Sequence, residues 1–130
     1  PVTVDVTLDE AQPADYDALV LPGGQINPDL LRVEDDALAF VTGFWQSGKV
    51  VAAICHAPWL LIETGIASGR KVTSYPSVKT DLINAGGLWE DSPVVSDSGL
   101  ITSRNRDDLD AFCERIGSEI VAGPHQRSAA

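Results

Sequence analysis

Two short, continuous apolar segments constrain the fold of this chain more than any other feature of its sequence. Residues 49–54 read Lys-Val-Val-Ala-Ala-Ile, and residues 17–21 read Asp-Ala-Leu-Val-Leu. Apolar runs of this length, without alternating polar residues, are typical of parallel strands that are covered on both faces. We therefore expect both segments to be central strands of a parallel sheet.

Helical patterns follow each of these two segments. Asn27 and Pro28 predict an N-cap with proline at the first helical position. Residues 34–47 then carry apolar side chains at helical spacing, and a further helix is expected from Ala57 to about residue 64. The order strand, helix, strand, helix predicts an α/β fold with a mostly parallel sheet.

The remaining segments predict smaller elements. Residues 2–8 alternate apolar and polar side chains, as in a peripheral strand that is exposed on one face. We expect a short strand at 71–74, a helix at 77–85 and a hairpin from 94–96 and 100–103. Residues 105–108 resemble a capping box before a final amphipathic helix, whose inward side chains should be Leu109, Phe112, Ile116 and Ile120.

The length of 130 residues suits a single domain, which we place at residues 1–122, with a flexible tail at 123–130. Little sequence precedes the first central segment, whereas a doubly wound domain carries a further strand–helix unit of about 30 residues or more. We therefore expect that an N-terminal strand–helix unit is missing.

Charge and composition exclude several classes of function. The net charge is −10 and only nine residues are basic, which argues against a nucleic-acid binder. No apolar run approaches the roughly 20 residues that cross a bilayer, and no secretory signal is recognisable, so we expect a cytoplasmic protein without membrane contact. Two isolated cysteines form neither a disulfide framework nor a zinc pattern, and we expect no metal and no cofactor.

Cys55 is the main candidate for a catalytic residue because it directly follows the apolar segment that ends at Ile54. A residue between a buried strand and a helix lies on a sharp turn, the nucleophile elbow, where free N–H groups favour the thiolate. His56 is the candidate proton carrier. Backbone N–H groups of the Gly23-Gly24 loop, with that of His56 or Ala57, could form an oxyanion hole.

Each of these residues also has a purely structural interpretation. Most lone cysteines are small buried hydrophobes, and Gly-Gly often makes only a tight turn. Asp29 could orient a histidine, although an acidic residue in a first helical turn more often complements the helix dipole. We interpret Cys113 as a packing residue of the last helix and His125 as solvated. The position of Cys55 at the elbow favours a reactive thiol there.

Five motifs in order along the chain resemble the PfpI branch of the ThiJ/PfpI superfamily. They are residues 15–24 (DYDALVLPGG), 53–58 (AICHAP), 69–75 (GRKVTSY), 81–86 (DLINAG) and 100–104 (LITSR) with 107–109 (DDL). The resemblance implies a flavodoxin-like three-layer sandwich, similar to class I glutamine amidotransferases, in a homodimer or hexamer. Those amidotransferases carry His-x-Glu near the C-terminus, whereas this chain has Thr-Ser-Arg-Asn at 102–105.

The resemblance also implies roles for single residues. Cys55 matches the family's nucleophile and His56 its partner, and Tyr75 matches a tyrosine near the site. Asp29 matches an acidic residue, usually glutamate, that reaches a histidine of a neighbouring subunit. The family's further glutamate, from a helix after the first strand, has no counterpart in this sequence.

The implied function is a cysteine hydrolase of stress defence. It would act as an intracellular protease on peptides, or as a deglycase on glyoxal and methylglyoxal adducts. The alternative is a non-enzymatic, redox-responsive stress or chaperone-like protein whose Cys55 is oxidised to a sulfinate.

Overall fold

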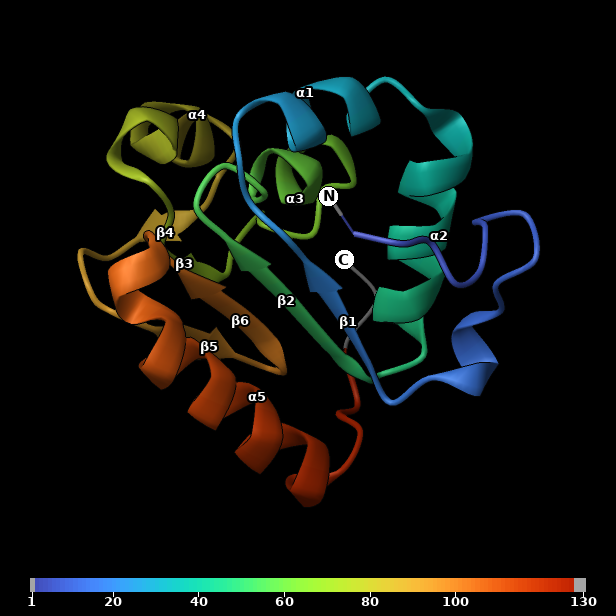
Figure 1. Cartoon of the computed structure of the whole chain (residues 1–130). Helices are drawn as coiled ribbons and strands as arrows, with labels where there is room; N and C mark the ends of the chain where they lie inside the picture. The colour runs from blue at the N-terminus through green and yellow to red at the C-terminus, as the bar shows by residue number, and fades with distance from the viewer. Residues whose placement is uncertain (1, 128–130) are drawn as a thin grey trace.

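The computed structural model describes residues 2–127, which form a sheet between two layers of helices (Figure 1). The sheet has four strands, ordered β1 (Ala18–Leu21), β2 (Val50–Ile54), β6 (Leu100–Ser103) and β5 (Val95–Asp97). The first three are parallel, while β5 pairs with β6 in antiparallel direction. The predicted mostly parallel α/β sandwich is therefore confirmed, as is the hairpin of residues 94–103.

Helices cover both faces of the sheet. On one face, α5 (Leu109–Ala122) contributes Phe112 and Ile116 to a core with Val50, Ala52 and Ile54. The opposite face is covered by α2 (Asp35–Gln46), α3 (Trp59–Glu63) and α4 (Lys79–Asn84). Because successive residues of β2 point to opposite faces, all five are buried, and the predicted central strand is confirmed.

Within the described chain, the other apolar segment lies at the edge of the sheet and not at the predicted central position. β1 pairs only with β2 among the described residues, and the side chain of Val20 is 48% exposed. The sequence pattern reports how apolar a strand is, but the number of its neighbours depends on which other strands pair with it. The predicted strand at residues 2–8 is also wrong, because this segment has no partner strand in the described chain and its valines are exposed.

The helices near Asn27, Ala57 and Ser77 begin at other residues than the sequence predicts. Asn27 lies inside α1 (Ile26–Leu31), whose N-cap is Gln25. The side-chain amide of Asn27 donates to the Pro22 carbonyl at 3.3 Å. The helix expected from Ala57 begins only at Trp59, because residues preceding a proline disfavour helical backbone angles. Residues 76–78 form a 3-10 turn before α4.

A two-stranded parallel sheet, absent from the sequence-based predictions, lies beside the main one. It pairs β3 (Lys71–Val72) with β4 (Leu88–Trp89). It is joined to the hairpin by the Lys71 amide, which donates to the Asp97 carboxylate at 2.8 Å. The short strand expected at 71–74 thus exists, and its continuation through residue 75 leads to the end of β2.

Residues 105–108 do cap the last helix, but not as a capping box. The Asn105 side chain accepts from the Asp107 amide at 2.9 Å, while the Asp108 carboxylate accepts from the Arg104 amide at 3.0 Å rather than from that of Asn105. A 3-10 turn (Arg106–Asp108) therefore precedes α5.

Two predicted inward positions of α5 are exposed. Leu109 is 45% and Ile120 is 39% exposed, because the sheet covers only the stripe that contains Phe112 and Ile116. Cys113 is exposed as well, so its interpretation as a packing residue is wrong. Leu109, Phe112 and Cys113 instead line an open apolar groove between α5 and β1.

The segment predicted to be a flexible tail packs against the domain as far as it is described. The His125 amide donates to the Gly48 carbonyl at 2.7 Å, and its imidazole lies 3.1 Å from the Glu119 carboxylate. The Arg127 guanidinium lies 3.5 Å from the centre of the Trp45 ring and donates to Lys49 O at 2.7 Å. Burial, with a smaller contribution from Arg70, lowers the pKa of Arg127 to about 10. Residues 128–130 of the predicted tail lie outside the described residues.

The Arg104–Asp108 ion pair, which joins the end of β6 to the start of α5, allows a test of this architecture. The side-chain hydrogen bonds from Arg104 hold the pKa of the 5%-exposed Asp108 carboxyl below its ordinary value of 3.8. Because the Asp108 carboxyl has a lower pKa in the folded state than in the unfolded state, its ionised form stabilises the fold above the unfolded-state pKa. This stabilisation is lost as the pH falls through the folded-state pKa. Asp108→Asn should therefore reduce the free energy of unfolding by about 1–3 kcal/mol at neutral pH, and by less near pH 3.

Urea denaturation at the two pH values measures this difference. Asp107→Asn is the matched control, because the neighbouring Asp107 side chain is exposed. Equal losses for the two variants at neutral pH would contradict the prediction.

Candidate active site

Cys55 occupies a strained turn directly after the central strand. Its φ angle is +66°, a left-handed backbone conformation that non-glycine residues rarely adopt. Such strain costs on the order of 1–3 kcal/mol and is typical of nucleophile elbows. Because α3 begins four residues later and has only five residues, the turn amides, rather than a helix dipole, surround the thiol.

Two backbone hydrogen bonds hold this turn in place. The Cys55 amide donates to the Ser103 carbonyl at the end of β6, at 3.1 Å. The Cys55 carbonyl accepts from the Tyr75 amide at 2.9 Å, from the loop that follows β3. Cys55 is thereby tied to two neighbouring segments and cannot relax independently of them.

Gly23 packs directly against the candidate nucleophile. A Cβ atom at this position would lie 2.7 Å from Cys55 Cβ and 3.0 Å from the Ile54 carbonyl, closer than real Cβ contacts. The loop after β1 therefore reaches the thiol only because residue 23 has no side chain. Glycine is favoured at position 24 for a different reason. The φ angle of Gly24 is +81°, which residues with a side chain rarely adopt, whereas no atom would crowd an added Cβ.

The imidazole of His56 lies between the thiol and a serine. Its Nδ1 is 3.2 Å from Cys55 Sγ, and its Nε2 is 3.2 Å from Ser77 Oγ. Tyr75 stacks on the ring, with centroids 4.8 Å apart and planes inclined by 22°, while Trp59 meets it edge-on at 5.2 Å. The geometry thus forms a Cys–His–Ser chain of polar contacts within a single chain.

Three backbone amides in the loops at Gly23-Gly24 and Cys55-His56 make no hydrogen bond in the described chain. Within residues 2–127, the N–H groups of Gly23, Gly24 and His56 have no hydrogen-bond acceptor. The Ala57 amide, by contrast, donates to the Ile54 carbonyl at 3.1 Å as part of the turn. The predicted oxyanion role of Ala57 therefore does not fit the structure, because its only donor is already used and the residue is fully buried.

Asp29 lies apart from this constellation within the chain. It is exposed on α1, and its carboxylate makes no hydrogen bond or ion pair with His56 in the described residues. Its role across a subunit interface stays a prediction.

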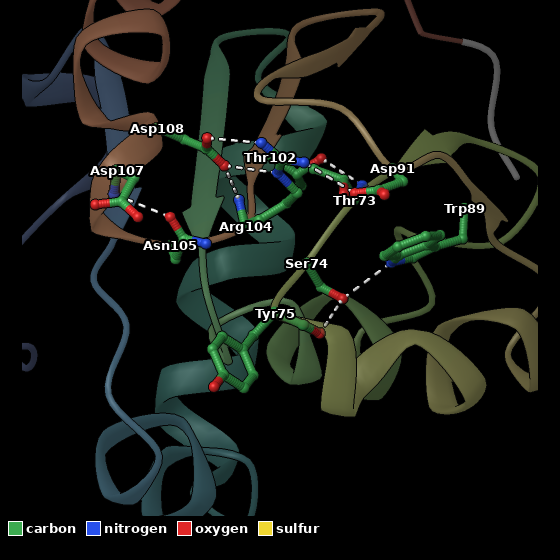
Figure 2. A network of polar contacts seen from close by, with 10 residues as sticks. All are labelled: Thr73, Ser74, Tyr75, Trp89, Asp91, Thr102, Arg104, Asn105, Asp107 and Asp108. Carbon is green, nitrogen blue, oxygen red and sulfur yellow. Dashed lines mark hydrogen bonds and ion pairs between the residues drawn. The ribbon is translucent and has the colours of Figure 1, made fainter.

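A polar network supports the loop that carries Tyr75 (Figure 2). Ser74 Oγ accepts from the Trp89 indole at 3.0 Å and donates to the Tyr75 carbonyl at 2.9 Å. One residue earlier, the Thr73 amide donates to Thr102 Oγ1 of β6 at 2.9 Å. These contacts hold the loop after β3 against the main sheet, so that Tyr75 faces His56.

Two residues that contact His56, Ser77 and Trp59, are not indicated by the sequence. The helical pattern at 77–85 places Ser77 in a helix, and no spacing rule connects residue 77 to residue 56. The Tyr-Pro dipeptide was the only available signal, because proline at the start of a tight turn predicts that residue 77 turns back.

No metal centre or membrane segment is found in the described part of the chain. Residues 2–127 contain no group of three or more His, Cys, Asp or Glu side chains placed to hold a metal ion. Among these residues, no helix has both the length and the apolar character needed to span a bilayer.

The contact between Gly23 and Cys55 generates a specific prediction. Gly23→Ala should destabilise the fold by about 1–3 kcal/mol through overpacking, and should slow alkylation of Cys55 by iodoacetamide because the thiol is displaced. Peptide mass spectrometry separates Cys55 from the exposed Cys113. Gly117→Ala in α5 is the matched control, since no atom lies within 4 Å of its added Cβ. Unchanged alkylation in Gly23→Ala would refute the close-approach argument.

Comparisons with known proteins agree with this geometry. The chain is 46% identical over 111 residues to deglycase PH1704 of Pyrococcus horikoshii, covering 85% of this chain and 66% of that protein. It is 43% identical over 111 residues to the putative cysteine protease YraA of Bacillus subtilis, covering 85% and 65%. The structure of Drosophila melanogaster DJ-1beta superposes with a TM-score of 0.84 at 34% identity, covering 92% of this chain and 64% of that one.

The chain thus spans slightly less than two thirds of the length of these two curated relatives. A profile of the DJ-1/PfpI family matches residues 1–119. On the match to nearly the whole chain and on the elbow geometry of Cys55, the protein belongs to the DJ-1/PfpI family.

Proposed function

We propose that the protein is a cysteine hydrolase that removes glyoxal and methylglyoxal adducts, in defence against carbonyl stress. The contact between Cys55 Sγ and His56 Nδ1, at an elbow beside free amides, is the observation that carries this proposal. One of the relatives described above is also named as a deglycase. A peptide substrate is the rival within the same chemistry, supported by the relative named as a putative cysteine protease.

The first chemical step is addition of the Cys55 sulfur to the carbonyl carbon of the substrate. The thiol proton moves to His56 Nδ1, the C–S bond forms, and the electron pair of the C=O bond moves to oxygen. The distance of 3.2 Å between sulfur and nitrogen suits direct proton transfer.

For a peptide, the C=O bond re-forms, the C–N bond breaks and His56 returns the proton to the departing amine, after which water hydrolyses the Cys55 thioester. For a methylglyoxal adduct, the departing amine or thiol is on the neighbouring carbon. Its C–N or C–S bond breaks and the departing group takes the proton from His56, the hydroxyl of that carbon becomes a C=O group, and the hydroxyl proton passes to the oxyanion. Reversal of the addition at Cys55 then releases the dicarbonyl.

The oxyanion would be stabilised by the backbone amides that line the turn. The N–H groups of Gly24 and His56 have no acceptor in the described chain, so they need not break a bond in order to bind the developing charge. Preorganised donors of this kind contribute about 3–4 kcal/mol each where one has been removed by mutation.

The proposed chemistry needs a reduced thiol at Cys55. Thiols are kept reduced in the cytoplasm, where we propose that the protein acts.

We also propose a homo-oligomer that uses α1. Three apolar side chains surround Asp29 on and near this helix, namely Ile26, Leu30 and Val33, which are 73%, 61% and 74% exposed.

Replacement of the nucleophile tests the proposed activity. Cys55→Ala should abolish release of amine or thiol from methylglyoxal adducts, measured on the full chain beside peptide substrates. Cys113→Ser should retain the activity, because Cys113 lies exposed on α5 and makes no hydrogen bond with Cys55 or His56 in the described chain. Full activity of Cys55→Ala would refute the proposal. Peroxide oxidation of Cys55 to a sulfinate in a protein that turns over neither substrate would favour the redox-sensor alternative.

The interface on α1 has its own test. Leu30→Glu should lower the mass measured by sedimentation, because it places a charge in the apolar contact. Val2→Glu is the control, since Val2 is 93% exposed in the N-terminal segment. A wild-type chain that sediments as a monomer would contradict the proposed oligomer.

A further inference from the structure

The orientation of the His56 ring is incompletely determined by its aromatic neighbours. Tyr75 stacks on one face and Trp59 contacts the ring edge-on, so that the plane of the imidazole is restrained. A rotation of the ring by half a turn about its Cβ–Cγ bond preserves this plane. It nevertheless replaces Nδ1 with a carbon next to the sulfur, and a carbon cannot accept the thiol proton.

Hydrogen bonds must therefore select the productive orientation. Cys55 Sγ contacts Nδ1, and Ser77 Oγ contacts Nε2, both at 3.2 Å. The same half-turn would also replace Nε2 with a carbon next to Ser77. Since thiols form weak hydrogen bonds, the contact with the hydroxyl is the stronger of the two.

The local fold places Ser77 rigidly for this contact. Ser77 is the middle residue of the 3-10 turn Pro76–Val78, in which the Val78 amide donates to the Tyr75 carbonyl at 2.9 Å. The Val78 side chain is fully buried in the core that lies under α2, α3 and α4. One short segment thus supplies both the stacking partner and the hydrogen-bonding partner of His56.

The carboxylates around this ring are engaged elsewhere in the described chain. Glu63 pairs with Arg32 at 2.8 Å, and the Arg32 guanidinium lies over the Trp59 ring. Asp81 accepts from the Trp59 indole at 3.1 Å. Within the described chain, an uncharged hydroxyl therefore contacts the ring nitrogen that does not face the nucleophile. At the corresponding nitrogen, many cysteine and serine hydrolases place an acidic or amide side chain.

We propose that Ser77 is the positioning residue of His56, and that its hydroxyl accepts the Nε2–H bond so that the unprotonated Nδ1 faces Cys55. This assignment rests on the proposed function, in which Nδ1 takes the thiol proton. When that proton arrives, Nε2 keeps its own hydrogen and the bond to Ser77 Oγ persists. The serine hydrogen stays on its oxygen and points to solvent, since Ser77 is exposed. No proton passes through Ser77.

The test compares three variants of the full chain. Ser77→Ala removes the acceptor, and we expect kcat to fall on the order of tenfold with KM unchanged, as for the loss of one hydrogen bond. Ser77→Thr keeps a hydroxyl at the same place and should restore most of the rate. Ser118→Ala is the matched control, because Ser118 is exposed on α5 and its hydroxyl bonds only to the Arg115 carbonyl.

A spectroscopic measurement makes the outcome independent of turnover. Long-range ¹⁵N–¹H spectra of the ring identify which nitrogen carries hydrogen, and His125→Gln assigns the signals because the chain has two histidines. The protonated Nε2 signal of His56 should shift in Ser77→Ala and return in Ser77→Thr.

The results separate this assignment from the proposed function. Ring signals and kcat that are both unchanged in Ser77→Ala overturn the role of Ser77 while leaving the hydrolase intact. The same holds if Asp29→Asn loses the rate and Ser77→Ala does not. If the wild-type chain turns over neither substrate but the ring signals depend on Ser77 as expected, the hydrolase is wrong and the positioning role stands.

Discussion

Burial of β2 on both faces is the constraint on which the site depends. Its five residues are all buried, and they pack against α5 on one side and α2 and α3 on the other. A strand fixed in this way cannot shift along its axis, because a slip of one residue would exchange the two sets of side chains. The end of β2, and with it Cys55, therefore has a defined place.

The rigid strand allows the turn at Cys55 to be strained. A left-handed φ angle persists only where the surroundings over-determine it. Here the surroundings are the Ser103 carbonyl, the Tyr75 amide and the closely packed Gly23, which come from three different segments. The strain keeps the thiol raised above the edge of the sheet, next to amides that remain free.

The loops after β1, β2 and β3 meet at one place, where they form the candidate active site. Parallel strands bring their carboxyl ends to one edge, where ligands bind in open α/β sheets. β3 belongs to the small second sheet, yet the loop that follows it is bonded to Cys55, directly after β2, and to Thr102 of β6. The Ser74 and Thr73 contacts in Figure 2 thus explain how residues 75–77 come to face residue 56.

The sequence alone determined the class of fold, the buried strand at residues 50–54 and the place of Cys55 at its end. These features are local, since apolar runs, turn residues and neighbouring positions are read directly along the chain. It also marked Gly23, Gly24 and Tyr75, which lie around the thiol. Only the tertiary structure decided that β1 is an edge strand, that the Ala57 amide is already used, and that Ser77 rather than Asp29 contacts His56 within the chain. The place of β1 and the Ser77 contact depend on which segments meet in the fold, and no local pattern encodes a contact between residues about twenty positions apart. The Ala57 bond to the Ile54 carbonyl depends instead on the backbone angles of the turn at Cys55, which its neighbours in space impose.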